Sequence, residues 1–225
     1  MPVERSPARD AAAAAAVEMV EESAVIALGS GRAVWRVVEL LAGRDVRAVV
    51  ASERTRAAAE AAGIEVVELD GHVRPVLALD GADEVDPALR LIKGGGGALL
   101  REKIVVSASE RFVVVAEADK QVDRLGEGFR LPVEVARFAW EDTARRLGAL
   151  LPGPELRREG DEPYLTDEGH YILDCSIPEG ADPSALDVDL RRVPGVMEHG
   201  LFVGLAERAL LGTPDGGVEV LRAED

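Results

Sequence analysis

The sequence contains few residues that cross-link a chain or hold a metal ion: one cysteine, Cys175, and three histidines among 225 residues. A single cysteine excludes an internal disulfide framework and favours a cytoplasmic protein. The histidines share no ligand spacing with one another or with Cys175, so we expect no metal site. Long apolar runs are missing too, since none approaches the ~18 residues of a membrane span. The alanine-rich run at 11–17 meets glutamates at once, unlike a secretory signal.

Positive charge is also scarce. The 42 acidic residues exceed the 26 basic ones, for a formal net charge of −16. Such a surface repels nucleic acid phosphates and anionic lipids, so we expect neither as a partner. The basic residues are nearly all arginine, and the three lysines, Lys93, Lys103 and Lys120, fall within one segment. Because arginine does not always replace lysine at a phosphate or an oxyanion, this grouping points to a binding site.

The first half of the chain alternates between short apolar runs and amphipathic patterns. The apolar runs, which predict strands, occupy residues 24–28, 46–51, 64–69, 76–79 and 112–117. The helical patterns occupy residues 33–41, 54–62 and 98–108. This alternation predicts an α/β fold, with right-handed crossovers and a mostly parallel sheet that is covered on both faces.

The pattern changes after about residue 126. Short strands are predicted at 131–135, 164–166 and 171–175, and helices at 140–150 and 183–193. This part therefore predicts a small α+β unit. At the end of the chain, apolar runs occupy 201–203, 208–211 and 218–221, and we expect them to rejoin the first sheet.

A glycine-containing turn at residues 28–33 joins the first strand to the next helix. Glycines there let the backbone approach a ligand, and a helix start offers free N–H groups to an anion. A dinucleotide fingerprint would need a third glycine where Val34 stands, although Glu53 lies about where a ribose-binding acid is expected. A phosphate site and a plain turn both remain open on these residues.

An acid-rich stretch, residues 80–86, follows another predicted strand. Asp80 falls at the carboxyl end of that strand, where ligands bind in open α/β sheets. Carboxylates packed this closely raise one another's proton affinity, which suits a group that donates and accepts protons. The spacing is not that of a calcium loop. The alternative is a solvated acidic turn, with Asp86 capping a helix that Pro87 begins.

A run of four glycines follows Lys93 and precedes a helical pattern. Four consecutive glycines are costly in backbone entropy, and the arrangement favours an anion nest with Lys93 as counter-charge. Glu102 lies in the opening turns of the next helix, near the same predicted pocket. Lys120 follows the strand at 112–117 and is expected to face the crevice of Asp80 and Lys93. The alternatives are a flexible loop, an ordinary helix glutamate and an exposed lysine.

Taken together, these segments resemble a known family. The residues that carry the resemblance are DGADEVD at 80–86, LIKGGGGAL at 91–99, REKIV at 101–105, ADKQVD at 118–123, LPVEV at 131–135 and LGTPDG at 211–216. In this order they are similar to ribose-5-phosphate isomerase of the A type, over residues 10 to 222. The resemblance implies a Rossmann-like domain at 1–127 and 201–225 with an inserted ferredoxin-like α+β domain at 128–200. It also implies a homodimer or homotetramer, no metal and no organic cofactor.

The implied reaction interconverts ribose 5-phosphate and ribulose 5-phosphate through an enediolate, in the pentose phosphate pathway. By the family match Glu102 shuttles the proton, and Lys93 with the glycine-loop amides supplies donors to the oxyanion. Asp80 and Asp83 match acids that hold sugar hydroxyls and assist ring opening. The residues expected to bind the substrate are Ser30, Gly31, Arg32, Ala33, Gly81, Ala82, Gly94, Gly95, Gly96 and Lys120.

The sequence departs from the family pattern in its phosphate loop. The family usually reads Gly-x-Gly-Thr-Gly-Ser-Thr, whereas residues 27–33 read Ala-Leu-Gly-Ser-Gly-Arg-Ala, and Asp-x-Ser-Lys becomes Glu-Ala-Asp-Lys at 117–120. We hypothesise that Arg32 replaces the lost hydroxyls with a charge-assisted contact. The alternatives are an isomerase of another sugar phosphate, a sugar-phosphate sensor module without catalysis, and a nicotinamide-dependent oxidoreductase, which Val34 disfavours.

Overall fold

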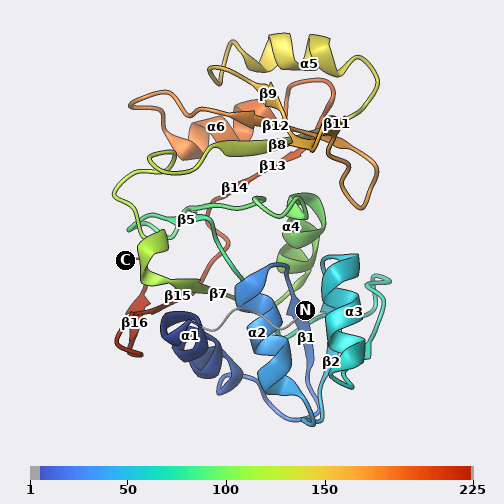
Figure 1. Ribbon diagram of the computed structural model, residues 1–225, viewed down its shortest axis with the longest axis vertical. Coiled ribbons are helices and arrows are strands. Elements are labelled where there is room, and N and C mark those ends of the chain that lie inside the picture. Colours follow the sequence, from blue (N-terminus) through green and yellow to red (C-terminus); the bar gives the residue numbers. More distant parts are fainter. Residues whose placement is uncertain (1–5, 224–225) are drawn as a thin grey trace.

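A seven-stranded sheet forms the larger part of the molecule, shown in the lower half of Figure 1. The computed structural model describes residues 6–223. In spatial order the strands of this sheet are β16 (Val218–Leu221), β15 (Arg208–Gly212), β7 (Phe112–Glu117), β4 (Leu77–Asp80), β1 (Val25–Leu28), β2 (Arg47–Val50) and β3 (Glu65–Val66). All neighbours are parallel except β15 and β16. The mostly parallel α/β sheet is confirmed, and the segments at 208–211 and 218–221 do rejoin it.

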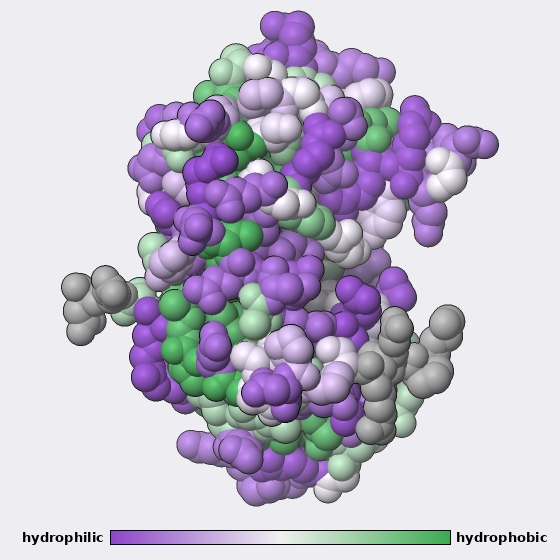
Figure 2. All heavy atoms as spheres, turned by 60° about the vertical axis from the view of Figure 1, so that its left-hand side comes forward, coloured by the Kyte–Doolittle hydropathy of each residue, from purple (hydrophilic) through white to green (hydrophobic). Residues whose placement is uncertain are grey.

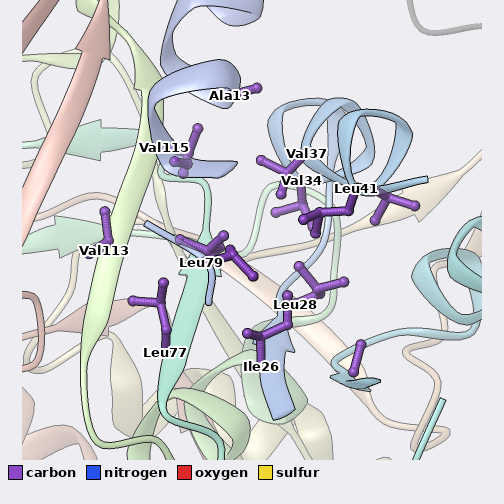
Figure 3. Close-up of a cluster of buried hydrophobic side chains, with 14 of the residues drawn as sticks. Ala13, Ile26, Leu28, Val34, Val37, Leu41, Leu77, Leu79, Val113 and Val115 are labelled. Carbon is purple, nitrogen blue, oxygen red and sulfur yellow. The ribbon is translucent and has the colours of Figure 1, made fainter. Parts of the chain in front are cut away.

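Helices cover both faces of this sheet, which explains why its central strands are apolar throughout. One face carries the helices α1 (Pro7–Val17), α2 (Arg32–Leu41) and α3 (Glu53–Ala61), and the other carries α4 (Leu99–Ala108). Figure 3 shows Val34, Val37 and Leu41 of α2 pointing at alternate side chains of β1 and β4. Their spacing is that of one helix face, so a single amphipathic stripe fixes the start of α2 over the carboxyl end of β1.

A second, antiparallel sheet lies beyond the first, in the upper half of Figure 1. Its strands are, in spatial order, β13 (Val196–His199), β8 (Leu131–Val135), β12 (Tyr171–Cys175) and β9 (Glu155–Leu156). Two helices, α5 (Trp140–Leu147) and α6 (Pro183–Leu190), accompany it, and a short hairpin joins β10 (Arg158–Glu159) to β11 (Glu162–Pro163). Its strands and helices share a separate apolar core.

Between the two sheets lies a three-stranded one. Its strands are, in spatial order, β14 (Leu201–Phe202), β6 (Leu91–Ile92) and β5 (Glu84–Val85). The segment at 201–203 therefore does not rejoin the first sheet, because it pairs antiparallel with β6. A 3-10 turn, Ala118–Lys120, follows β7. Within residues 6–223, every helix is too short or too polar to cross a membrane.

One predicted strand was wrong, and so was one part of the alternative interpretation of residues 80–86. Residues 164–166 form no strand, because they follow β11 and turn toward the glycine run. Pro87 begins a turn and not a helix, and Asp86 accepts the backbone N–H of Ala88 at 3.0 Å and that of Arg90 at 2.9 Å. The helices predicted at 140–150 and 183–193 end earlier, at Leu147 and Leu190.

Candidate active site

A cavity of about 150 Å³ opens at the carboxyl ends of β1, β4 and β7. Loops after parallel strands meet at this edge, which is where open α/β sheets bind ligands. The predicted residues that line it are Ser30, Gly31, Arg32, Ala33, Gly81, Ala82, Asp83, Lys93, Gly94, Gly95, Gly96, Glu102 and Lys120. Only Asp80, among the predicted site residues, is enclosed behind this lining, with no exposed surface. Polar side chains cover most of the face of the molecule drawn in Figure 2.

Three ionisable side chains meet at the cavity, two in its lining and Asp80 directly behind it. The Lys93 Nζ lies 2.8 Å from the Asp80 Oδ2 and 3.4 Å from the Glu102 Oε2, and it donates to the carbonyl of Gly81 at 2.7 Å. The Lys93, Asp80 and Glu102 side chains are 3%, 0% and 6% exposed. Buried charges are tolerated only when they are paired, and here one ammonium serves two carboxyl groups.

This shared cation leaves Glu102 with an unusual proton affinity. Burial, and then the negative charge of Asp80, raise the pKa of Glu102 to about 8, although the Lys93 ammonium opposes them. Burial also works against the Lys93 charge, but Asp80 and Glu102 outweigh it and raise the pKa of the ammonium above its ordinary value. A carboxyl group that titrates near neutrality can both accept and return a proton, as a general base must.

The turn after β1 is built around Asp80. A Cβ on Gly29 would lie 1.9 Å from the Asp80 Cγ, so glycine is required there to admit the carboxyl group. The Asp80 Oδ1 accepts the backbone N–H of Gly81 at 2.7 Å and that of Ser30 at 3.2 Å. The first glycine of this turn therefore makes room for a side chain of the protein, whereas Gly31, at φ +101°, faces open space and caps α2.

The other acidic residues of the 80–86 stretch each contact different partners. Asp83 lines the cavity, and its Oδ2 accepts the Gly95 N–H at 2.8 Å. Glu84 is buried and accepts three backbone N–H groups from residues 126–129 at 2.6–2.7 Å. Asp86 pairs with the Arg90 guanidinium at 2.6 Å. Within residues 6–223, no three His, Cys, Asp or Glu side chains are grouped as a metal site.

Three cationic residues line the cavity besides Lys93: Arg9, Arg32 and Lys120. Arg9 was not among the site residues predicted from the sequence. Neither was Glu117, which pairs with Arg9 and accepts the Ser6 hydroxyl at 3.0 Å. Arg9 stands in the first turn of α1, where the helix dipole disfavours a cation, so its position was a signal that could have been used.

Lys103 lies outside the cavity. Its Nζ donates to Glu198 at 2.8 Å and to the carbonyls of His199 and Leu201 at 2.7 and 2.8 Å. It thereby fixes the chain where β13 leads into β14. Two of the three lysines thus belong to the site, and the third holds α4 to the returning chain.

Comparisons with known proteins agree on one family. Residues 47–216 match the family described as ribose 5-phosphate isomerase A (phosphoriboisomerase A). Proteins named ribose-5-phosphate isomerase A from a Roseiflexus species and from Gloeobacter violaceus are 48% and 47% identical, over 94% and 95% of both chains. The solved structure of ribose 5-phosphate isomerase A from Neisseria gonorrhoeae superposes with a TM-score of 0.92, at 36% identity over all of both chains. A D-ribose-5-phosphate isomerase in complex with phospho-erythronic acid gives a TM-score of 0.91, at 34% identity over 99% of this chain and 100% of that one.

Proposed function

The chain belongs to the ribose-5-phosphate isomerase A family, and we propose that the cluster of Asp80, Lys93 and Glu102 is where it performs the reaction. The protein interconverts D-ribose 5-phosphate and D-ribulose 5-phosphate, a step of the pentose phosphate pathway. One observation carries the assignment of the site: the Glu102 carboxyl group lines the cavity, with a pKa raised to about 8, 3.4 Å from a buried ammonium.

Glu102 acts as the proton shuttle. As a carboxylate it removes the proton from C2 of the open-chain aldose, and the electron pair of that bond forms the C1=C2 double bond of an enediolate. The negative charge that develops on the C1 oxygen needs a fixed donor, and the Lys93 ammonium is placed beside Glu102 to supply it. The C2 hydroxyl proton then passes to the C1 oxygen. Glu102 returns its proton to C1 while C2 becomes the carbonyl carbon.

The two aspartates have different positions and therefore different roles. Asp83 lines the cavity and is only partly buried, so it can accept hydrogen bonds from the sugar hydroxyls and assist ring opening. Asp80 is fully enclosed and 2.8 Å from the Lys93 Nζ, so its role is to hold that ammonium in place and keep it charged. This assigns Asp80 to positioning, where the sequence predicted contact with the substrate.

The phosphate group is bound where the cations gather. Arg9, Arg32 and Lys120 line the cavity, and the first N–H groups of α2 lie beside them. A phosphate dianion at a helix start with three cations is strongly favoured, so the hydroxyls that the turn lacks are replaced by charge-assisted contacts. The sensor alternative is not favoured, because the match to the isomerase relatives extends over nearly the whole chain.

We also propose the division into a Rossmann-like domain, residues 1–127 and 201–225, and an inserted domain, residues 128–200. Residues 1–5 and 224–225 lie outside the described part of the chain. The separate apolar core of the second sheet supports this division. A homodimer or homotetramer, with contacts through the inserted domain, and a cytoplasmic location are further parts of the proposal.

The experiment compares ketose formation from ribose 5-phosphate by the native chain, by Glu102→Gln and by a control, Glu60→Gln. Glu60 is exposed on α3 and does not line the cavity, so its variant is expected to retain native rates. Loss of the base is expected to lower kcat by about 10²- to 10⁴-fold. A Glu102→Gln variant as active as the control would remove Glu102 from the mechanism.

A further inference from the structure

The glycine run that lines the cavity is contacted from outside by an arginine of the antiparallel part of the molecule, the residues 128–200 around the second sheet. Arg157 follows β9, and its Nη1 donates to the carbonyl of Gly94 at 2.8 Å and to that of Gly95 at 3.2 Å. The same guanidinium pairs with Asp174 of β12, its Nε lying 2.9 Å from the Asp174 Oδ2. The Arg157 side chain is 14% exposed, so the contact is largely withdrawn from water.

A tyrosine holds the next carbonyl of the run. The Tyr164 hydroxyl donates to the carbonyl of Gly96 at 3.1 Å. A Cβ on Gly97 would lie 2.2 Å from the Tyr164 Oη, so the ring packs directly against the loop. The Arg157 guanidinium lies over the same ring, 6.0 Å from its centroid. Three successive carbonyls, at 94, 95 and 96, are therefore bound by two adjacent side chains.

These contacts determine which way the loop amides point. In a planar trans peptide the N–H points opposite to the C=O. With the Gly94 carbonyl held by Arg157, the Gly95 N–H points the other way and donates to Asp83 at 2.8 Å. By the same geometry, the Gly96 N–H points away from Arg157, because Arg157 holds the Gly95 carbonyl of the same peptide. Arg157 itself lines a separate groove behind the loop, together with Gly95 and Asp174. Gly96 itself lines the cavity.

We propose that Arg157 and Tyr164 are positioning residues for the isomerase reaction, which orient the glycine run so that Asp83 and the Gly96 N–H are presented to the sugar phosphate. The inference rests on the proposed function, because it gives the loop a part in that reaction. A run of four glycines has no conformational preference of its own. Catalytic donors must nevertheless be held within about 0.5 Å of their working geometry. The loop closes one turn of its own, in which the Gly97 N–H donates to the Gly94 carbonyl at 3.0 Å, and the two side chains of the antiparallel part hold its carbonyls from outside.

The test uses substitutions in the full chain that remove the hydrogen bonds of Tyr164 or of Arg157 to the loop carbonyls. Tyr164→Phe deletes only the hydroxyl and keeps the ring against Gly97. Arg157→Met deletes both carbonyl contacts, and Arg157→Lys keeps a cation that can reach one of them. Arg158→Met is the matched control, since Arg158 is an exposed neighbour whose Nη1 donates to the local carbonyl of Asp161 and not to the glycine run. For each variant, kcat and KM for ribose 5-phosphate and the melting temperature are measured.

Tyr164→Phe is expected to lower kcat about tenfold with KM within about twofold and a nearly native melting temperature, because only the presentation of transition-state donors changes. Arg157→Met is expected to lower kcat by about 10²-fold and also the melting temperature, because Asp174 loses its partner. Arg157→Lys should recover part of kcat. Native kcat in Tyr164→Phe, or a kcat in Arg157→Met that matches the Arg158→Met control, would overturn the proposal.

A separate readout distinguishes this proposal from the proposed function. The affinity for phospho-erythronic acid, the ligand named for a related solved structure, is measured by calorimetry for the native chain and the same variants. If the native chain forms no ribulose 5-phosphate, the proposed function fails. In that case weaker binding in Arg157→Met than in the Arg158→Met control shows only that these contacts order the ligand-binding loop, and the role in the isomerase reaction falls with the proposed function. With an active native chain, unchanged kcat in the variants refutes the positioning role alone.

Discussion

Replacing Glu102 with glutamine is expected to stabilise the folded protein as well as to inactivate it. The folded protein encloses this carboxyl group, with a side chain only 6% exposed, beside the negative charge of Asp80. Burial and that charge raise its pKa from the ordinary 4.5 to about 8. A glutamine of the same shape carries no titrating proton, so the folded variant avoids the free-energy cost of ionising a carboxyl group at this buried position.

The sign and size follow from proton linkage. Between pH 4.5 and 8 the Glu102 carboxyl is ionised in the unfolded chain but keeps its proton in the folded protein. The folded state therefore binds more protons, and its stability falls as the pH rises through this window. At about 1.4 kcal/mol for each pH unit, the cost reaches at most about 5 kcal/mol above pH 8 and is about 2 kcal/mol at pH 6. The advantage of glutamine should therefore grow by about 3 kcal/mol between pH 6 and pH 9.

Urea unfolding followed by circular dichroism, at pH 6 and pH 9 and at one protein concentration, measures this difference. The shift corresponds to a change of about 6 to 12 °C in the melting temperature for a chain of this length. Glu60→Gln is again the control, and its difference from the native chain should not change with pH. A Glu102→Gln advantage that is constant or shrinks toward pH 9 would refute the reasoning, because the native carboxyl would then be ionised in both states.

Three further predictions concern activity. The kcat/KM for ribose 5-phosphate should rise about tenfold per pH unit below pH 8 and level off above it, because Glu102 must be ionised to take the proton; a flat profile from pH 6 to 9 would contradict this. Arg32→Ser should raise KM about tenfold with little change in kcat, since a charge-assisted phosphate contact is lost, whereas an unchanged KM would show that Arg32 points away from the phosphate. Among residues 6–223, no atom lies within 4 Å of a Cβ built on Gly96, apart from its chain neighbours. Gly96→Ala should therefore keep the native melting temperature and lower kcat/KM, and native kcat/KM would place the substrate away from this residue.

The meeting of Asp80, Lys93 and Glu102 could be predicted from the sequence because periodicity locates the sheet edge, while the glycine run and the family resemblance supply the residues. Alternating apolar strands and amphipathic helices imply a parallel sheet, and the carboxyl ends of parallel strands share one edge. Asp80 follows a predicted strand and Glu102 lies in the opening turns of a predicted helix, whereas Lys93 was found from the glycine run that follows it and from the family resemblance. Arg9 could not be found in this way. Its unfavourable position in the first turn of α1 signals a partner, but its place in the cavity depends on how α1 packs against β7 and β15, which local patterns do not encode.

The wrong strand at 164–166 has a related cause. The aromatic and β-branched residues there suit a strand, but their side chains are used for tertiary contacts, one with the glycine run and one within the antiparallel part. Tyr164 binds the Gly96 carbonyl, and the Thr166 hydroxyl donates to the buried Glu134 at 2.9 Å. Propensity counts such residues as strand formers whatever they touch, so tertiary contacts of this kind are a systematic source of error.

The four glycines at 94–97 illustrate what a motif does and does not reveal. Gly94, at φ +106°, and Gly97, at φ +81°, adopt backbone conformations that other residues avoid. A Cβ on Gly95 would lie 2.7 Å from the Asp83 Oδ1. Three of the four glycines are thus required by the loop and its neighbours even before a substrate binds, and only Gly96 leaves space on the cavity side. The sequence correctly predicted that this loop lies at the cavity, and its anion-binding role stays a prediction. The need for consecutive glycines comes mostly from the packing of Asp83, Leu99 and Tyr164 around it.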